Sequence, residues 1–262
     1  MPPKSRLGQN FLRDEGAVAR MVASLGDISD ATVLEIGPGH GALTFLLAEK
    51  AKKLIAVEVD PELANELRVS FRNHENFTLI ERSILAVDFA EIAQGEKLVV
   101  IGNLPYYITS EILLHILDQH QSIQRAVLMV QREVAERVTA EPGSRDYGLL
   151  TVTVALHAGA EELFTLPPQA FVPPPQVHST VFRLHIAPRF EELGVEPEAF
   201  IGFLRRCFVQ KRKTLTNNLR SAGYAAAAIE ASMAKAAVPL KARAETLELT
   251  RFAALFKALE QN

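Results

Sequence analysis

The feature of this sequence that most limits its possible folds is a regular alternation of β-rich and helix-like segments from Thr32 to Gln131. The segment 60–71, for example, has the pattern of a helix, with Asp60 at the N-cap position and Pro61 at the first helical position. Strands that alternate with helices predict a parallel, doubly wound sheet whose ligands bind at the carboxyl ends of the strands. The segments that we expect to form these strands are 32–36, 53–59, 76–80, 97–103 and 126–131.

The alternation ends after residue 148. Two further β-rich runs, 149–158 and 178–186, have only the proline-rich "FTLPPQAFVPPPQV" between them. We expect these runs to form an antiparallel hairpin at one edge of the sheet, which brings the sheet to seven strands. From residue 197 onward the sequence is helical and rich in alanine. The sequence therefore predicts an α/β domain over 1–190 and a small all-α C-terminal domain over 191–262.

Charge and composition exclude several classes of protein. The chain has 28 Lys and Arg against 31 Asp and Glu, and a net charge of −3 is not that of a general polyanion binder. The single cysteine, Cys207, rules out a disulfide framework, and the histidines lack the spacing of metal ligands or of zinc deaminases. The N-terminus lacks the apolar run of a signal peptide, and no segment has the ~18 apolar residues of a membrane span. We therefore expect a cytoplasmic protein that uses no metal and no membrane.

A glycine-rich segment, "EIGPGHGALT" (35–44), lies between the first predicted strand and a predicted helix. Gly37 and Gly39 allow the backbone to turn tightly and to approach a ligand at the helix N-terminus. The pattern alone fits a dinucleotide loop, an S-adenosylmethionine loop or a tight turn without a ligand. Glu35 favours S-adenosylmethionine, because a carboxylate before the loop repels a pyrophosphate and attracts a sulfonium or ammonium group. Glu58, at the end of the second predicted strand, suits the ribose hydroxyls of either cofactor.

The segment "IGNLPYY" (101–107) ends the fourth predicted strand with residues that do not favour a strand. The exocyclic amine of adenine is a poor nucleophile, because its lone pair is delocalised into the ring. Two acceptors would free that lone pair: the Asn103 side-chain oxygen and the Leu104 carbonyl, which Pro105 keeps out of the helical conformation. Tyr106 offers a ring face on which the base can stack. The segment therefore predicts methylation of an adenine amine, the alternative being a plain strand-ending turn.

With these motifs the chain resembles the ribosomal RNA small-subunit adenine dimethyltransferases, the KsgA/RsmA family of class I methyltransferases. The matching stretches follow the family order over nearly the whole chain: "LGQNFL", "EIGPGHGALT", "EVD", "IGNLPYY", "VQREVAERVTAEPGSRDYG", "FVPPPQVHSTVFRL" and "QKRKTLTNNL". The resemblance implies a Rossmann-like, S-adenosylmethionine-binding domain over 1–190 and a helical RNA-binding domain over 191–262. It also implies dimethylation of N6 on two adjacent adenosines near the 3′ end of 16S ribosomal RNA, with a role in small-subunit biogenesis. The expected partner is this RNA within the small subunit, and we expect a monomer.

The resemblance further implies roles for individual residues. Tyr106 corresponds to the base-stacking residue. Phe171 corresponds to the opposing aromatic wall, although "FVPPPQV" taken alone is more typical of a polyproline linker. Cofactor contacts fall on Gly39 of the glycine loop and on Asn10, Leu12, Gly37, Glu58 and Asn103.

One cofactor position departs from the family pattern. Where the family has an Asp that accepts a hydrogen bond from the adenine amino group of the cofactor, this chain has Ser83. A hydroxyl accepts the bond without charge, and a charged acceptor adds about 1 kcal/mol. We therefore expect weaker cofactor binding, unless Arg82 or Asp88 rearranges the pocket.

The segment 199–229 contains six basic residues and no acidic residue. In a continuous helix, Arg206, Lys213 and Arg220 would recur every seven residues. They would lie opposite an apolar face that includes Phe200 and Leu204. A solvated surface is the commonest role of such a charge run. The absence of acids in an otherwise acidic chain favours an RNA-phosphate surface instead. The six residues are Arg205, Arg206, Lys211, Arg212, Lys213 and Arg220.

Three other functions stay open at this point. Two are adenine methyltransferases that act on large-subunit ribosomal RNA or on DNA. The DNA enzymes more often have a second proline where Leu104 stands, and "KRKTLTNNL" favours the small-subunit branch. The third is a small-subunit assembly checkpoint protein with little or no catalysis, an interpretation that rests on Ser83 alone.

Overall fold

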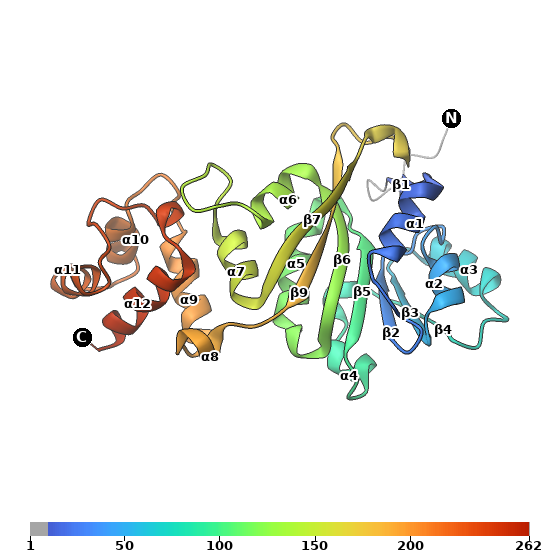
Figure 1. The fold of residues 1–262 in the computed structure, drawn as a ribbon, viewed down its shortest axis with the longest axis horizontal. Coiled ribbons are helices and arrows are strands. Elements are labelled where there is room, and N and C mark those ends of the chain that lie inside the picture. The colour runs from blue at the N-terminus through green and yellow to red at the C-terminus, as the bar shows by residue number, and fades with distance from the viewer. Residues whose placement is uncertain (1–9, 262) are drawn as a thin grey trace. The chain divides into compact units, whose positions relative to one another are not determined.

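The computed structural model describes residues 10–261, and the contacts among them divide the chain into two compact units (Figure 1). The first unit comprises the chain up to Ala135 together with Gly159–Ile186. The second comprises Glu136–Ala158 together with the chain from Ala187 onward. The sequence predicts a domain boundary at residue 190 and so includes 136–158 in the first domain. The contacts assign these residues to the second unit instead. The catalytic and RNA-binding roles given to the two domains stay predictions.

The described residues of the first unit form a seven-stranded sheet. β9 pairs with β6 in the antiparallel direction, and the five strands from β4 to β6 in the sheet order are parallel to one another. Each of the five predicted parallel strands is confirmed to within three residues at its ends. In sheet order the strands are β4 (Phe77–Glu81), β3 (Lys53–Glu58), β2 (Thr32–Ile36), β5 (Leu98–Asn103), β6 (Ile123–Gln131), β9 (Ser179–Ile186) and β7 (Ala158–Leu166).

The order of these strands makes the sheet doubly wound. From β2 the chain moves outward to β3 and β4, and it then returns to β5 on the other side of β2. Right-handed crossovers in opposite directions lie on opposite faces of a sheet, and the crevice between β2 and β5 is where ligands bind. A short antiparallel pair, β1 (Phe11–Leu12) with β8 (Phe171–Val172), lies outside the sheet. The helices are α1 (Glu15–Ala23), α2 (Thr44–Lys50), α3 (Pro61–Ser70), α4 (Phe89–Ala93) and α5 (Thr109–Asp118).

The prediction of a strand over 149–158 is wrong, because 149–157 form the helix α7 (Leu149–His157) and Ala158 is the first residue of β7. The run of Val and Thr favours a strand locally, but packing favours the helix. Val152 and Leu156, one helical turn apart, are both buried in the core of the second unit. The Thr153 hydroxyl donates to the Leu149 carbonyl at 2.8 Å. The strand that lies beside β9 is β7, in which only the two end residues are buried.

Apart from Ala158, which begins β7, the regular elements among the described residues of the second unit are helices. Its core includes Phe200, Phe203 and Phe252, which are fully buried. The continuous helix considered for 199–229 is absent: a helix ends at Cys207, and the next begins at Leu215. Besides α7 the helices are α8 (Phe190–Leu193), α9 (Pro197–Cys207), α10 (Leu215–Ser221), α11 (Ala226–Lys235) and α12 (Leu249–Glu260), and α6 (Arg132–Val138) spans the boundary between the units.

Candidate active site

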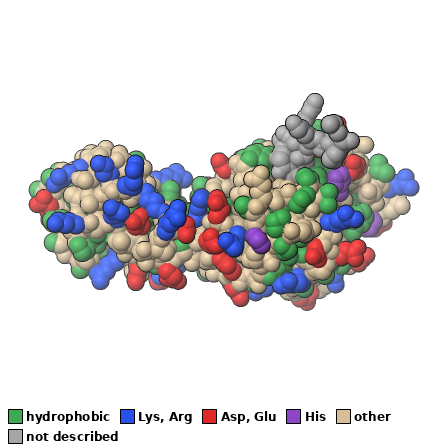
Figure 2. Space-filling view, turned by 90° about the horizontal axis from the view of Figure 1, so that it is seen from above, with side chains coloured by type: hydrophobic (Ala, Val, Ile, Leu, Met, Phe, Trp, Pro, Cys, Tyr) green, Lys and Arg blue, Asp and Glu red, His purple; other side chains and the backbone are tan. Residues whose placement is uncertain are grey.

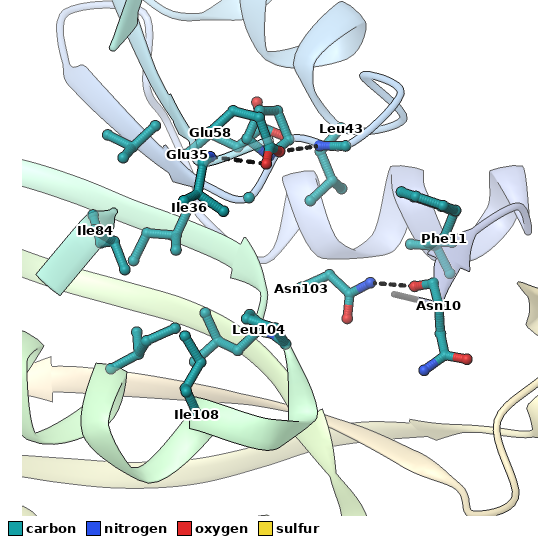
Figure 3. A pocket seen from close by; sticks show the side chains of 18 of the residues that line it. Asn10, Phe11, Glu35, Ile36, Leu43, Glu58, Ile84, Asn103, Leu104 and Ile108 are labelled. Atoms are coloured by element: carbon teal, nitrogen blue, oxygen red, sulfur yellow. Dashed lines mark hydrogen bonds between the residues drawn. The ribbon is translucent and has the colours of Figure 1, made fainter. Parts of the chain in front are cut away.

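A cavity opens at the carboxyl ends of β2, β3 and β5, at the crevice that the strand order predicts. Figure 3 shows Glu35 and Glu58 near one another and Asn103, from the end of β5, opposite Asn10 and Phe11. The cavity brings together all the cofactor-binding residues expected from the sequence and the whole "NLPY" segment. These residues are Asn10, Leu12, Gly37, Gly39, Glu58, Ser83, Asn103, Leu104, Pro105 and Tyr106.

The glycine loop closes one end of the cavity. Gly39 has a φ of 59°, and a Cβ at this position would lie 3.0 Å from the Phe11 ring. Only glycine therefore allows the loop to turn here and to pass so close to β1. His40, the next residue, packs against Phe11 with ring centroids 4.4 Å apart and ring planes tilted by 52°, and its Nδ1 lies 2.8 Å from a carboxylate oxygen of Glu66. Phe11 and His40 line the cavity but were not among the expected site residues, although His40 lies within the loop motif itself.

The buried carboxylate of Glu58 joins the end of β3 to this loop. Its Oε2 accepts a hydrogen bond from the Gly39 amide at 3.1 Å. Its Oε1 accepts from the amides of Val59 and Asp60 at 2.9 and 3.0 Å. These bonds keep the carboxylate in the cavity wall, 3% exposed. Because each oxygen of an ionised carboxylate has two acceptor sites, Oε2 of Glu58 can still accept one hydrogen bond from a ligand.

Glu35 contributes a second buried carboxyl group, which is 1% exposed and lines the same cavity. Its Oε2 has no hydrogen-bond partner among the described residues. Burial raises the pKa of Glu35 to about 8, the nearby Thr44 hydroxyl opposes the rise, and the Glu58 carboxylate adds to it. A cationic ligand beside the unpartnered oxygen would lower this pKa and favour the ionised carboxylate, whereas a pyrophosphate would raise it further.

The residues after β5 are held by hydrogen bonds at both ends of the segment. The Asn103 Nδ2 donates to the Asn10 carbonyl at 3.0 Å (Figure 3). The Leu104 amide donates to the Met129 carbonyl at 2.9 Å, and the Thr109 hydroxyl donates to the Pro105 carbonyl at 2.9 Å. The "NLPY" segment, which lines the cavity, is therefore anchored by hydrogen bonds.

Tyr106 is half-buried, and its hydroxyl lies 2.6 Å from the Oγ of Ser179. Burial raises the pKa of the Tyr106 phenol, and the hydrogen bond with Ser179 opposes the rise. Neither this contact nor the role of Ser179 was expected from the sequence. The signal that could have found it is the "HST" at the end of the proline-rich motif.

Ser83 lines the cavity, as expected, and has an extended backbone at the start of a short turn. Of the two residues considered as compensation, Arg82 also lines the cavity. Asp88 does not, because its side chain caps α4 by accepting a hydrogen bond from the Ala90 amide at 2.8 Å. The structure therefore leaves Arg82 as the charged side chain next to Ser83.

Phe171 is not brought into the cavity. Its side chain is 2% exposed and packs in the hydrophobic core of the first unit. In the β1–β8 pair it lies opposite Leu12, which lines the cavity in its place. The prediction that Phe171 forms an aromatic wall opposite Tyr106 stays untested, and it requires the ring to leave this core.

The six basic residues expected at an RNA surface are all exposed and lie in the second unit. Figure 2 shows a number of Lys and Arg side chains close together on one face of this unit. Arg206 donates to the Tyr224 hydroxyl at 3.1 Å, and Lys211 donates to the Arg145 carbonyl. Arg220 lies 3.5 Å from Glu230, the first acid beyond the basic segment.

Two further features concern residues 10–261 as a whole. Within them no group of three or more His, Cys, Asp or Glu side chains could hold a metal ion. None of the helices described there is long and apolar enough to cross a membrane.

A doubly wound sheet with a glycine loop that faces a buried carboxyl group is the arrangement of the class I methyltransferases, which use S-adenosylmethionine. The cationic cofactor fits the unpartnered oxygen of Glu35. Within this class the chain belongs to the ribosomal RNA adenine dimethylase family, whose model matches residues 3–261.

Curated relatives and solved structures agree with this assignment. Ribosomal RNA small subunit methyltransferase A of Acidobacterium capsulatum is 57% identical over 258 residues, which are 98% of this chain and 91% of that protein. The protein of the same name from Koribacter versatilis is 50% identical over 98% of this chain and 95% of its own length. A dimethyladenosine transferase from Plasmodium falciparum has a TM-score of 0.76 at 25% identity, covering 94% of this chain and 95% of that one. The 23S ribosomal RNA methyltransferase ErmE has a TM-score of 0.73 at 28% identity, covering 96% and 100%.

Proposed function

We propose that this enzyme dimethylates N6 of two adjacent adenosines near the 3′ end of 16S ribosomal RNA, within the small ribosomal subunit. The observation that carries the proposal is the position of the "NLPY" segment, which lines the same cavity as the glycine loop. The names of the relatives that are 57% and 50% identical support the small subunit as the substrate. We further propose that the enzyme acts in the cytoplasm as a monomer and takes part in small-subunit biogenesis.

S-adenosylmethionine supplies the methyl group. The residues that would hold it line the cavity on both sides of the β2–β5 crevice. Glu58 would accept a hydrogen bond from a ribose hydroxyl at the one free acceptor site, on its Oε2, and Ser83 would accept a hydrogen bond from the adenine amino group. Glu35 would face the cationic end. The other expected contacts are Asn10, Leu12, Gly37, Gly39 and Asn103.

The Asn103 and Leu104 oxygens would activate the target amine. Because the Asn103 Nδ2 already donates to the Asn10 carbonyl, the amide is oriented so that its Oδ1 is the atom left to accept. Two acceptors, this Oδ1 and the Leu104 carbonyl, would draw the N–H bonds of the adenine amine out of the ring plane. An amide is no base, so the proton would leave after methyl transfer, when the nitrogen has become acidic. The segment would thus act by orientation and electrostatics.

The target adenine would leave its stack and lie against the Tyr106 ring, which requires it to be unpaired or easily flipped. Phe171 would complete the pocket only after a movement of the β1–β8 pair, because its ring is buried. The RNA backbone would bind the basic side chains of the second unit, since the net charge of −3 gives the whole chain little affinity for polyanions.

The test is methyl incorporation into small subunits that lack the modification, with large subunits in parallel. We expect dimethyladenosine at two adjacent positions of the small-subunit RNA and none in large-subunit RNA. Incorporation into large-subunit RNA would instead favour an activity like that named for ErmE. Tight binding to small subunits without incorporation would favour the assembly checkpoint.

A further inference from the structure

The hydroxyl of Tyr106 and the Oγ of Ser179 lie 2.6 Å apart, within hydrogen-bond distance. Tyr106 opens the short helical turn η2 (Tyr106–Ile108) after β5 and lines the cavity. Ser179 is the first residue of β9 and is fully buried. The bond therefore joins the predicted base platform to a residue 73 positions further along the chain.

The two ends of this bond come from different kinds of backbone structure. Ser179 is paired with Gln131 in the β6–β9 ladder. The carbonyl before it, that of His178, accepts a hydrogen bond from the Arg132 amide at 2.9 Å. Tyr106 lies outside the sheet, in the three-residue turn η2, where the Ile108 amide and the Thr109 hydroxyl donate to the Pro105 carbonyl at 3.3 and 2.9 Å. A fixed strand residue thus holds a side chain that comes from a short turn.

This restraint matters for a stacking side chain. Rotation about the two side-chain torsions of a tyrosine changes the tilt of its ring, and a base stacks well only on a ring of matching tilt. A hydrogen bond at the phenol oxygen fixes the position of that atom and so limits the first torsion. Because the O–H bond and the acceptor lone pair of a phenol prefer the plane of the ring, the direction of Ser179 from the oxygen also favours one ring tilt. Because burial raises the pKa of the Tyr106 phenol, the hydroxyl stays protonated and the bond stays intact over the physiological range.

We propose that Ser179 is a positioning residue for methyl transfer, which holds the Tyr106 ring at the tilt that the target adenine requires. The proposal rests on the stacking role of Tyr106 given above. It assigns a function to the serine of "FVPPPQVHST" that is separate from that of Phe171.

Two substitutions remove the bond from opposite ends: Ser179→Ala and Tyr106→Phe. Each should lower the single-turnover rate on bound small subunits about 3- to 10-fold, as expected for one hydrogen bond. The affinity for S-adenosylmethionine should stay unchanged, and the melting temperature should fall by only a few degrees. The double variant should be no slower than the slower single variant, because both changes remove the same interaction. The share of monomethylated adenine, measured by mass spectrometry, should rise, since each transfer needs the base aligned.

Thr180→Val is the matched control. It removes a buried hydroxyl from the next residue of β9. The Oγ1 of Thr180 lies 2.9 Å from that of Thr165, so this change leaves the bond to Tyr106 in place. This variant should keep the rate and the product ratio of the wild type. Ser179→Thr retains a hydroxyl and should recover part of the lost rate. Should Ser179→Ala fail to fold, Tyr106→Phe still removes the bond and leaves the buried strand unaltered.

Tyr106→Ala separates the two proposals. If it keeps full turnover, the stacking role fails and the role of Ser179 fails with it. If it abolishes turnover while Tyr106→Phe and Ser179→Ala behave as Thr180→Val does, the proposed function stands and the positioning role of Ser179 is wrong.

Discussion

The side-chain nitrogen of Asn103 lies 3.0 Å from the backbone oxygen of Asn10, 93 positions away in the sequence. This bond decides which end of the Asn103 amide is left to accept a hydrogen bond, because the nitrogen can only donate. It also ties the segment before β1 to the end of β5. The expected acceptor role of Asn103 therefore depends on a contact between distant parts of the chain.

Asn103→Ala should lower the turnover number by about 10²–10³, the usual loss when a preorganised polar group at the reacting atom is removed. The affinity for S-adenosylmethionine should fall much less, because the other cavity residues remain. Calorimetric titration and methyl-incorporation kinetics measure the two effects. Asn217→Ala, an exposed amide of α10, is the control and should change neither. Equal losses of affinity and turnover would make Asn103 mainly a binding residue.

Ser83→Asp should tighten the binding of S-adenosylmethionine, because a charged acceptor binds an amino group more strongly than a hydroxyl by about 1 kcal/mol. That difference is roughly a fivefold lower dissociation constant. Binding of small subunits should not change. Ser221→Asp, at an exposed position of the second unit, adds the same charge away from the cavity and serves as the control. Unchanged or weaker cofactor binding would show that the pocket is built around the serine, with Arg82 beside it.

Replacement of Arg206, Lys213 and Arg220 by alanine should weaken the binding of small subunits and flatten its salt dependence. The slope of log K against log salt should fall by about 0.7–0.9 for each lost phosphate contact. The transfer rate on bound RNA should barely change, because none of these residues lines the cavity. Wild-type affinity at every salt concentration would show that these side chains are a solvated surface.

The control for this variant removes three exposed basic side chains from the first unit. It should keep the affinity and the salt slope of the wild type, which separates local phosphate contacts from a change of net charge. The three residues are Lys50, Arg72 and Lys97.

The stability of the protein without cofactor should fall as the pH rises through a window set by Glu35. Burial raises the pKa of this carboxyl group from 4.5 to about 8, so the folded state keeps a proton that the unfolded chain has already released. Below this window both states are protonated and the group costs nothing. Within it the free energy of unfolding falls by at most about 1.4 kcal/mol per pH unit, and above it the loss is complete.

Glu35→Gln has a similar shape but no proton to lose. Its melting temperature, followed by circular dichroism, should therefore decrease less with pH than that of the wild type. Glu49→Gln, which changes an exposed glutamate, should retain the wild-type slope. Coincident slopes for Glu35→Gln and the wild type would mean that Glu35 ionises in the folded state at an ordinary pH.

Much of the first unit could be predicted because its signals are local. The buried β-rich runs, the Asp60 cap of α3 and the glycine loop each depend on residues adjacent in the chain. Parallel strands end at one edge of the sheet, so the motifs that follow β2, β3 and β5 had to meet there. In this sense the sequence by itself determined the parallel part of the sheet, the cavity and most of its lining.

Other features were decided by the tertiary structure. Residues 149–158 have the composition of a strand, yet Val152 and Leu156 bury more effectively in the second unit as a helix. Local patterns also do not determine which distant residues come into contact. The burial of Phe171 opposite Leu12, the Tyr106–Ser179 bond and the unpartnered oxygen of Glu35 arise when elements far apart in the chain pack together, and such packing is not encoded in any single segment.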